Sequence, residues 1–95
     1  MDILDGVMML KEEKDLELLK QKVMDLTQDL YNKGLMKDSY IYETSDIRDA
    51  LIAEWNQTGK INTWKMEQTE RWDFFMKVDL LVTKQFYEEI LKEKE

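Results

Sequence analysis

The chain has 95 residues, the length of one small domain, and its 43% hydrophobic content is enough for a core of modest size. It contains no cysteine and no histidine, so disulfides, thiol nucleophiles and the commonest general base and metal ligand are excluded, and we expect no metal and no cofactor. The formal net charge of −7 argues against direct nucleic-acid binding, which draws its affinity from a basic surface.

Proline is absent and only three glycines interrupt the chain, a composition that favours long helices over sheets. No apolar run has the length of a signal peptide or a membrane span, so we expect a cytoplasmic protein that does not contact a membrane. The predicted fold is all-α: a single domain over residues 1–95, built as a small three-helix up-down-up bundle with a long apolar C-terminal helix.

The first helix is predicted over about residues 8–33. Five apolar residues recur in it at intervals of three or four: Leu16, Leu19, Val23, Leu26 and Leu30. This spacing forms one apolar seam along a helix, and Gly34 suits the position just after its end. Two interpretations of the seam stay open: it packs within the same chain, or it joins two chains in a homodimer.

Residues 35–43 are predicted to connect the first helix to a second one over about 45–57. Thr44 or Ser45 is expected to cap the second helix, and Gly59 follows its end. Its inner stripe is predicted to consist of Ile47, Ala50, Leu51 and Trp55. The short link that follows favours an antiparallel return.

The third helix is predicted over about 63–92, with Asn62 or Thr63 as its cap, and it carries the densest apolar load of the chain. At about 100° per residue, one face holds Trp72, Phe75, Met76, Val82, Phe86 and Ile90. A second face holds Phe74, Val78 and Leu81. A helix with so wide an apolar arc is normally buried on most sides, so we expect the rest of the chain to pack around it.

Asp79 falls inside this apolar arc, where an unpaired carboxylate would be costly. Arg48 is its most plausible partner, because the only other arginine, Arg71, belongs to the same predicted helix. A structural ion pair and a functional acid are the two interpretations of Asp79.

Two features are candidates for binding a partner protein. The first is the acidic outer side of the first helix, formed by Glu12, Glu13, Asp15, Glu17, Asp25 and Asp29. It is either a solvated face or a surface that docks on a basic groove or mimics nucleic-acid phosphates. The second is Trp64, which lies among polar residues where burial is difficult, and tryptophan is enriched at binding hot spots.

Part of the chain also resembles a known family. Ser45 and Asp49 open the second predicted helix, and Leu51, Ile52 and Trp55 follow them. This arrangement is similar to the Ser-Gln-Glu-Leu-Asp signature, Leu-Ile pair and aromatic of the small helical-hairpin aspartyl-phosphate phosphatases of the sporulation phosphorelay.

The family's first helix and link also have similar counterparts here, at Leu16-Glu17-Leu18-Leu19-Lys20-Gln21-Lys22-Val23 and Gly34-Leu35. The resemblance covers residues 16–57, although Asp46, Ile47 and Arg48 stand where the family has Gln, Glu and Leu. It implies that Asp49 acts as an essential acid on the aspartyl phosphate of a receiver domain.

From the residues themselves we predict a non-enzymatic interaction protein, without catalytic residues, that binds and modulates another protein with a basic surface. Small, acidic, cysteine-free helical proteins are often regulators or inhibitors encoded by phages and other mobile elements, including blockers of host nucleic-acid enzymes. Two alternatives remain: a phosphatase-like regulator that uses Asp49, and a structural homo-oligomer.

Overall fold

The computed structural model describes residues 2–94 of the chain. Its elements in chain order are α1 (Ile3–Met9), α2 (Glu13–Asn32), α3 (Ser39–Thr58), the short 3-10 helix η1 (Thr63–Lys65) and α4 (Gln68–Lys94). No strand occurs in residues 2–94, so the predicted all-α class is confirmed, although the bundle has four α-helices and not three. None of these helices has both the length and the apolar character that crossing a bilayer requires.

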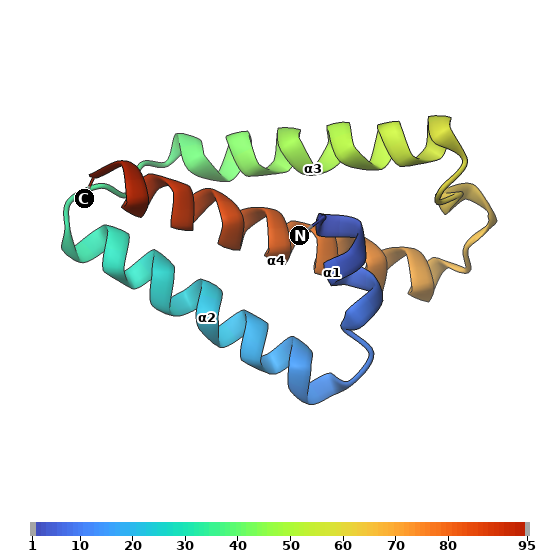
Figure 1. Cartoon of the computed structure of the whole chain (residues 1–95), viewed down its shortest axis with the longest axis horizontal. Coiled ribbons are helices and arrows are strands. Elements are labelled where there is room, and N and C mark those ends of the chain that lie inside the picture. The colour runs from blue at the N-terminus through green and yellow to red at the C-terminus, as the bar shows by residue number, and fades with distance from the viewer. Residues whose placement is uncertain (1, 95) are drawn as a thin grey trace.

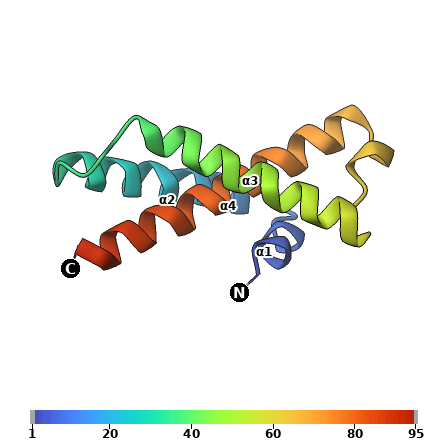
Figure 2. The ribbon, with the colours of Figure 1, turned by 90° about the horizontal axis from the view of Figure 1, so that it is seen from above.

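The other helices are arranged around α4. Figure 1 shows α4 between α2 and α3, with α1 lying across its middle, and Figure 2 shows α3 crossing above it. The main interhelical contacts join α4 to each of the other three helices, whereas α2 and α3 have few contacts with each other. The expectation that the chain packs around its C-terminal helix is therefore confirmed.

Two clusters of buried side chains hold the helices on α4. The larger cluster joins Phe74, Val78 and Val82 of α4 to residues of α1, α3 and the following loop: Val7, Ile52, Trp55 and Ile61. The smaller cluster joins Tyr87 to Leu26 and Leu30 of α2. Burial of these apolar surfaces is the main force that stabilises the arrangement.

The apolar face predicted for the C-terminal helix is partly wrong. Trp72 and Met76 were expected on the buried face, but both are exposed. The buried residues of the first half of α4 are Phe74, Val78 and Val82, which recur every four residues and meet α1 and α3. Because α1 and α3 cover one side of α4 and α2 covers another, the arc around Trp72 has no covering helix.

The predicted first helix over residues 8–33 is in fact two helices. α1 ends at Met9, and α2 begins at Glu13 after an extended Glu12. The break lets Val7 pack on α4 before the chain reverses into α2. Acidic residues in a first turn favour a helix start there, through the helix dipole, and Glu13 and Asp15 occupy this turn of α2. The end of α2 is as expected, since Gly34 adopts a positive φ of 71°.

The second helix begins at Ser39, six residues before the predicted start at 45. Thr44 does not cap it: the hydroxyl of Thr44 lies inside α3 and donates to the carbonyl of Tyr40 at 2.9 Å. Threonine can make this bond within a helix as well as cap one, so its cap signal misleads here. Tyr40 packs edge-on against Phe86 of α4, with ring centroids 5.3 Å apart, and this contact helps to fix the early start.

The buried face of this helix also differs from the predicted inner stripe. The buried residues of α3 are Thr44, Ile52 and Trp55, whereas Ile47 and Ala50 are exposed.

The third helix begins at Gln68 and not at residue 63, because Met66 is extended and separates η1 from α4. The loop over residues 59–67 is consequently longer than predicted, and it carries Trp64.

The larger cluster predicts a sharp difference between two neighbouring aromatic residues. Phe74 is buried and packs against Trp55 with ring centroids 5.9 Å apart, so Phe74→Ala should lower the free energy of unfolding by about 3–5 kcal/mol. Trp72→Ala should change it by no more than about 0.5 kcal/mol, because its ring is exposed. Urea titration followed by circular dichroism measures both, and similar losses in the two variants would contradict this core.

Candidate protein-binding surface

The three tryptophans have very different environments. Trp55 is only 4% exposed and belongs to the core, whereas Trp64 is 81% and Trp72 is 67% exposed. A tryptophan ring in water offers a large apolar area that a partner can bury. The prediction of Trp64 as a partner-binding residue therefore falls on an accessible side chain, and the structure adds Trp72.

The loop that carries Trp64 is anchored at its start. Gly59 ends α3 in the left-handed conformation with φ 77°, and the backbone N–H of Lys60 then donates to the carbonyl of Trp55 at 3.1 Å. Ile61 inserts its side chain into the larger cluster. The chain is thus attached to the core three residues before Trp64.

Side-chain hydrogen bonds fix the next residues. The carboxamide of Asn56 in α3 donates to the hydroxyl of Thr63 and accepts from the backbone N–H of Thr63, both at 3.1 Å. The carboxamide of Asn62 accepts from the backbone N–H of Trp64 at 3.1 Å. Thr63 is buried, so its polar groups need these partners, and Trp64 is presented from an ordered backbone.

Arg71 of α4 holds the loop from the other side. Its Nε–H donates to the carbonyl of Thr63 at 3.0 Å, and its guanidinium lies over the Trp64 ring, 5.8 Å from the ring centroid. That distance is within the range of a cation–π interaction. The orientation of the Trp64 ring is therefore supported in the unbound protein.

Two hollows lie beside Arg71. The first has a volume of about 300 Å³ and is lined by α3, the loop and α4: Asp49, Ile52, Ala53, Asn56, Thr63, Trp64, Arg71 and Phe75. The second, of about 420 Å³, is lined by Gln68, Arg71, Trp72 and Phe75. Arg71 and Phe75 line both hollows, so Trp64 and Trp72 border one connected surface, which we call the two-tryptophan surface.

Little in the sequence indicates that Arg71, Trp72 and Phe75 belong to this surface. Trp72 and Phe75 fit the apolar period of the helix, and that period points to a core. Arg71 is connected to Trp64 only through the fold of the loop. The one local signal is composition, since charged residues flank Trp72 on both sides.

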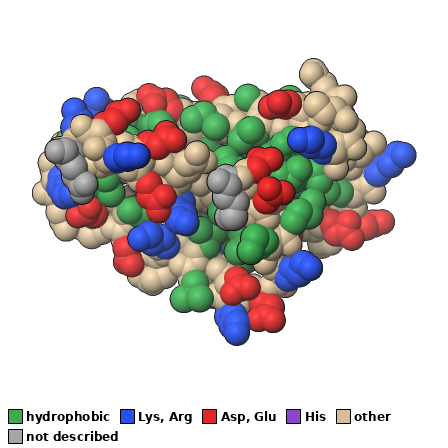
Figure 3. All heavy atoms as spheres, viewed as in Figure 1, with side chains coloured by type: hydrophobic (Ala, Val, Ile, Leu, Met, Phe, Trp, Pro, Cys, Tyr) green, Lys and Arg blue, Asp and Glu red, His purple; other side chains and the backbone are tan. Residues whose placement is uncertain are grey.

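The acidic residues predicted to bind a partner lie at the start of α2 and along it, and most are exposed. Three of them form ion pairs with lysines at 3.4 to 3.6 Å: Glu12 with Lys14, Glu17 with Lys20, and Asp29 with Lys33. Asp25 accepts from the carboxamide of Gln21 at 2.9 Å, and Glu13 and Asp15 occupy the first turn. The helix therefore carries both signs of charge, and Figure 3 shows acidic and basic side chains interspersed over one side of the molecule.

The acidic start of α2 lies beside the first half of α4. A hollow of about 290 Å³ is lined there by Lys11, Glu12, Glu13, Leu16, Asp73 and Lys77. Asp73 and Lys77 form an ion pair at 2.7 Å, and Asp73 directly follows Trp72. The fold thus brings two of the predicted acidic residues, Glu12 and Glu13, beside Asp73 and Lys77 of α4.

Arg48 and Asp79 are paired as the sequence predicted. The guanidinium of Arg48 lies 3.6 Å from the carboxylate of Asp79 and 3.0 Å from that of Asp49. The Asp79 side chain is 42% exposed and that of Asp49 is 67% exposed, so Asp79 occupies a partly solvated edge and not a closed apolar site. Ion pairs of this kind contribute little to stability.

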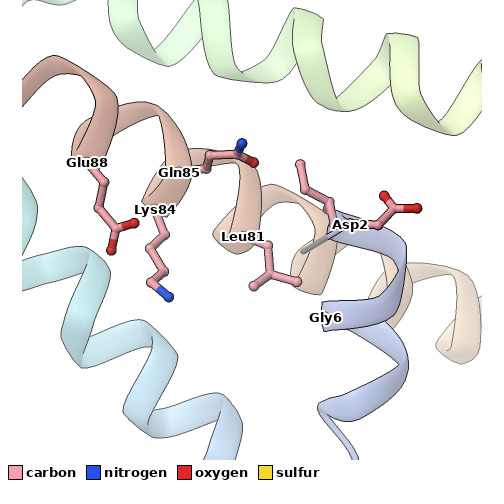
Figure 4. A pocket seen from close by; sticks show the side chains of 7 residues that line it. Asp2, Gly6, Leu81, Lys84, Gln85 and Glu88 are labelled. Carbon is pink, nitrogen blue, oxygen red and sulfur yellow. The ribbon is translucent and has the colours of Figure 1, made fainter. Parts of the chain in front are cut away.

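Within residues 2–94 no group of three acidic side chains is placed to hold a metal ion. A hollow of about 230 Å³ lies between α1 and α4. Figure 4 shows that the charged ends of Asp2 and Lys84, which line it, point away from each other.

Comparison of the chain with protein-family models, curated proteins and solved structures finds no match.

The Asn56–Thr63 contact can be tested through stability and exchange. Asn56→Ala should lower the free energy of unfolding by about 1–3 kcal/mol, because it leaves buried polar groups of Thr63 without partners. The backbone amides of Thr63 and Trp64 should also exchange with deuterium faster. Asn32→Ala, which removes an exposed carboxamide contact with Gln28, serves as the control and should change stability by no more than about 0.5 kcal/mol. Equal losses in both variants would show that the contact does not fix the loop.

Proposed function

We propose that the protein is a non-enzymatic binding module of the cytoplasm that modulates or inhibits another protein, and that Trp64 anchors this partner. The observation that carries the proposal is an exposed tryptophan on a loop that is tied down on both sides. Loops that are ordered before binding lose little conformational entropy when a partner arrives. Tryptophan and arginine, the two residues that meet here, are also enriched at binding hot spots.

The net charge supports a partner with a basic surface. A charge of −7 attracts a basic protein over a distance of about one Debye length, which is near 10 Å at moderate salt. Glu12 and Glu13 are exposed at the start of α2 and add to this negative charge. A nucleic-acid enzyme of a host cell, bound by a phage or mobile-element protein, is a partner of this kind, since its substrate groove is basic.

A homodimer is the alternative in which the partner is a second copy. The exposed ring of Trp72 and the uncovered side of α4 favour it, whereas the shared charge of −7 opposes close approach of two copies. The leucine seam of α2 offers less to a dimer, because Leu19, Leu26 and Leu30 are buried within the chain.

The anchor role predicts a selective loss of affinity. With the protein as bait in lysate of its source cell, the captured partner should bind Trp64→Ala about thirtyfold more weakly than wild type, which corresponds to about 2 kcal/mol. Tyr42→Ala is the matched control, because Tyr42 is an aromatic residue of α3 that is also largely exposed, and its affinity should change less than threefold.

Two further measurements separate the alternatives. Binding to a basic partner should weaken as salt is raised, because salt screens exposed charges. Sedimentation at micromolar concentration tests the homodimer. If wild type sediments as a dimer and Trp64→Ala as a monomer, the surface binds a second copy of the chain. Equal affinity of wild type and Trp64→Ala for the captured protein would refute the anchor.

A phosphatase-like activity on a receiver domain is the second candidate. Asp49 supports it, since this carboxylate is exposed and lines the first hollow beside the guanidinium of Arg48. The binding module is the better supported candidate, because the carboxylate of Asp49 is already paired with Arg48, whereas Trp64 offers a partner a large exposed ring on an ordered loop.

The two candidates differ in turnover. Incubation with a phosphorylated receiver domain should release phosphate no faster than the spontaneous rate, for wild type and for Asp49→Ala alike. Asp46→Ala is the control, because Asp46 is another exposed acid of α3. Catalytic release by wild type and by Asp46→Ala, lost in Asp49→Ala with an unchanged melting curve, would establish the phosphatase.

A further inference from the structure

We infer that the two-tryptophan surface recognises a protein segment that places a carboxylate on Arg71 between two apolar side chains. This inference rests on the proposed function and adds the chemistry of the segment. The segment belongs to a separate protein, and its acidic residue is a local feature that is compatible with a basic surface elsewhere on that protein.

Arg71 is positioned to receive a carboxylate. Its Nε–H is committed to the carbonyl of Thr63, which fixes the guanidinium plane and leaves the two terminal amino groups. Among residues 2–94 no carboxylate lies within 4 Å of this guanidinium, whereas Arg48 pairs with both Asp49 and Asp79. A guanidinium fixed in this way can form two parallel hydrogen bonds to one carboxylate.

The hollows determine what flanks the carboxylate. Arg71 lines both of them, with Trp64 and Ile52 on one side and Trp72 on the other. Apolar side chains of a bound segment would bury these rings, and the removal of water would strengthen the ion pair at Arg71. The expected pattern is therefore an acidic residue with an apolar residue on each side.

The local charge balance permits this choice. Five basic and five acidic residues lie between positions 48 and 77, so this part of the chain is neutral, whereas the whole chain carries −7. They are Arg48, Lys60, Lys65, Arg71 and Lys77, and Asp49, Glu54, Glu67, Glu70 and Asp73. At long range the protein favours basic ligands, so a preference for an acid can arise only from a specific contact.

The other charge at the first hollow is less suited to binding. Asp49 lines this hollow, but its carboxylate already accepts from Nε and Nη2 of Arg48 at 3.1 and 3.0 Å. A basic residue of a ligand would have to compete with that pair, whereas an acidic residue at Arg71 displaces no ion pair of the described chain. The charges at the surface thus favour a carboxylate.

The test is selection from a library of random twelve-residue peptides displayed on phage, with the full-length protein immobilised. Peptides selected by wild type should carry Asp or Glu between two apolar residues, and replacing that acid by Gln or Asn in a synthetic peptide should weaken binding at least tenfold. Arg71→Gln and Arg71→Lys form a matched pair, because both lose the Nε contact with Thr63 and only the first loses the charge.

The acid preference should vanish in Arg71→Gln and persist, in weaker form, in Arg71→Lys. Lys65→Gln, which removes an exposed base that lines neither hollow, should leave the preference unchanged. The inference is overturned if wild type selects no sequence, selects basic or purely apolar peptides, or keeps its acid preference in Arg71→Gln. Loss of the acid preference in both Arg71 variants overturns the inference too. The preference would then depend on the loop contact that both variants lose and not on the positive charge.

Failure here is distinguishable from failure of the proposed function. If a captured partner depends on Trp64 while the selected peptides show no acid preference, the binding module stands and only the carboxylate is wrong. If wild type and Trp64→Ala select the same peptides with equal affinity, the anchor itself is refuted. Self-association that is lost in Arg71→Gln would place a second copy on the surface and exclude a separate partner.

Discussion

The need to cover α4 determines the rest of the structure. This helix has 27 residues, and its apolar side chains point to several sides, so one neighbouring helix cannot bury them. α1 and α3 meet the side that carries Phe74, Val78 and Val82, and α2 meets Tyr87. Because the covering helices lie on different sides, α2 and α3 diverge, and the side chain of Trp72 stays exposed on α4.

The short helix α1 shows how strongly this requirement acts on local structure. Seven residues are too few for a helix that is stable alone, yet Val7 of α1 is buried in the larger cluster, with Ile3 and Leu4 packed against it. The break before α2 follows from the same cause, since a continuous helix would carry these side chains away from α4. Tertiary packing therefore decides a helix boundary that the apolar period of α2 does not reveal.

The sequence predicts the features that depend on local chemistry. Gly34 and Gly59 mark the two helix ends where the backbone needs a positive φ, and the Arg48–Asp79 pair follows from the cost of a lone carboxylate on an apolar face. It predicts poorly the features that depend on distant contacts. The sequence around Thr44 resembles a helix start, but the helix begins earlier because Tyr40 packs against Phe86. Arg71 belongs to the candidate site because it binds the carbonyl of Thr63, a contact that the sequence does not reveal.

Exposure alone does not distinguish Trp64 and Trp72 from the other exposed apolar residues. Met9, Leu18 and Tyr31 are also largely exposed, but single apolar side chains on a protein surface are ordinary. Trp64 and Trp72 differ because each borders a hollow and both hollows share Arg71 and Phe75. A partner that buries one of these rings therefore lies close to the other. The guanidinium of Arg71 between them would orient the partner through hydrogen bonds, which two apolar contacts alone cannot do.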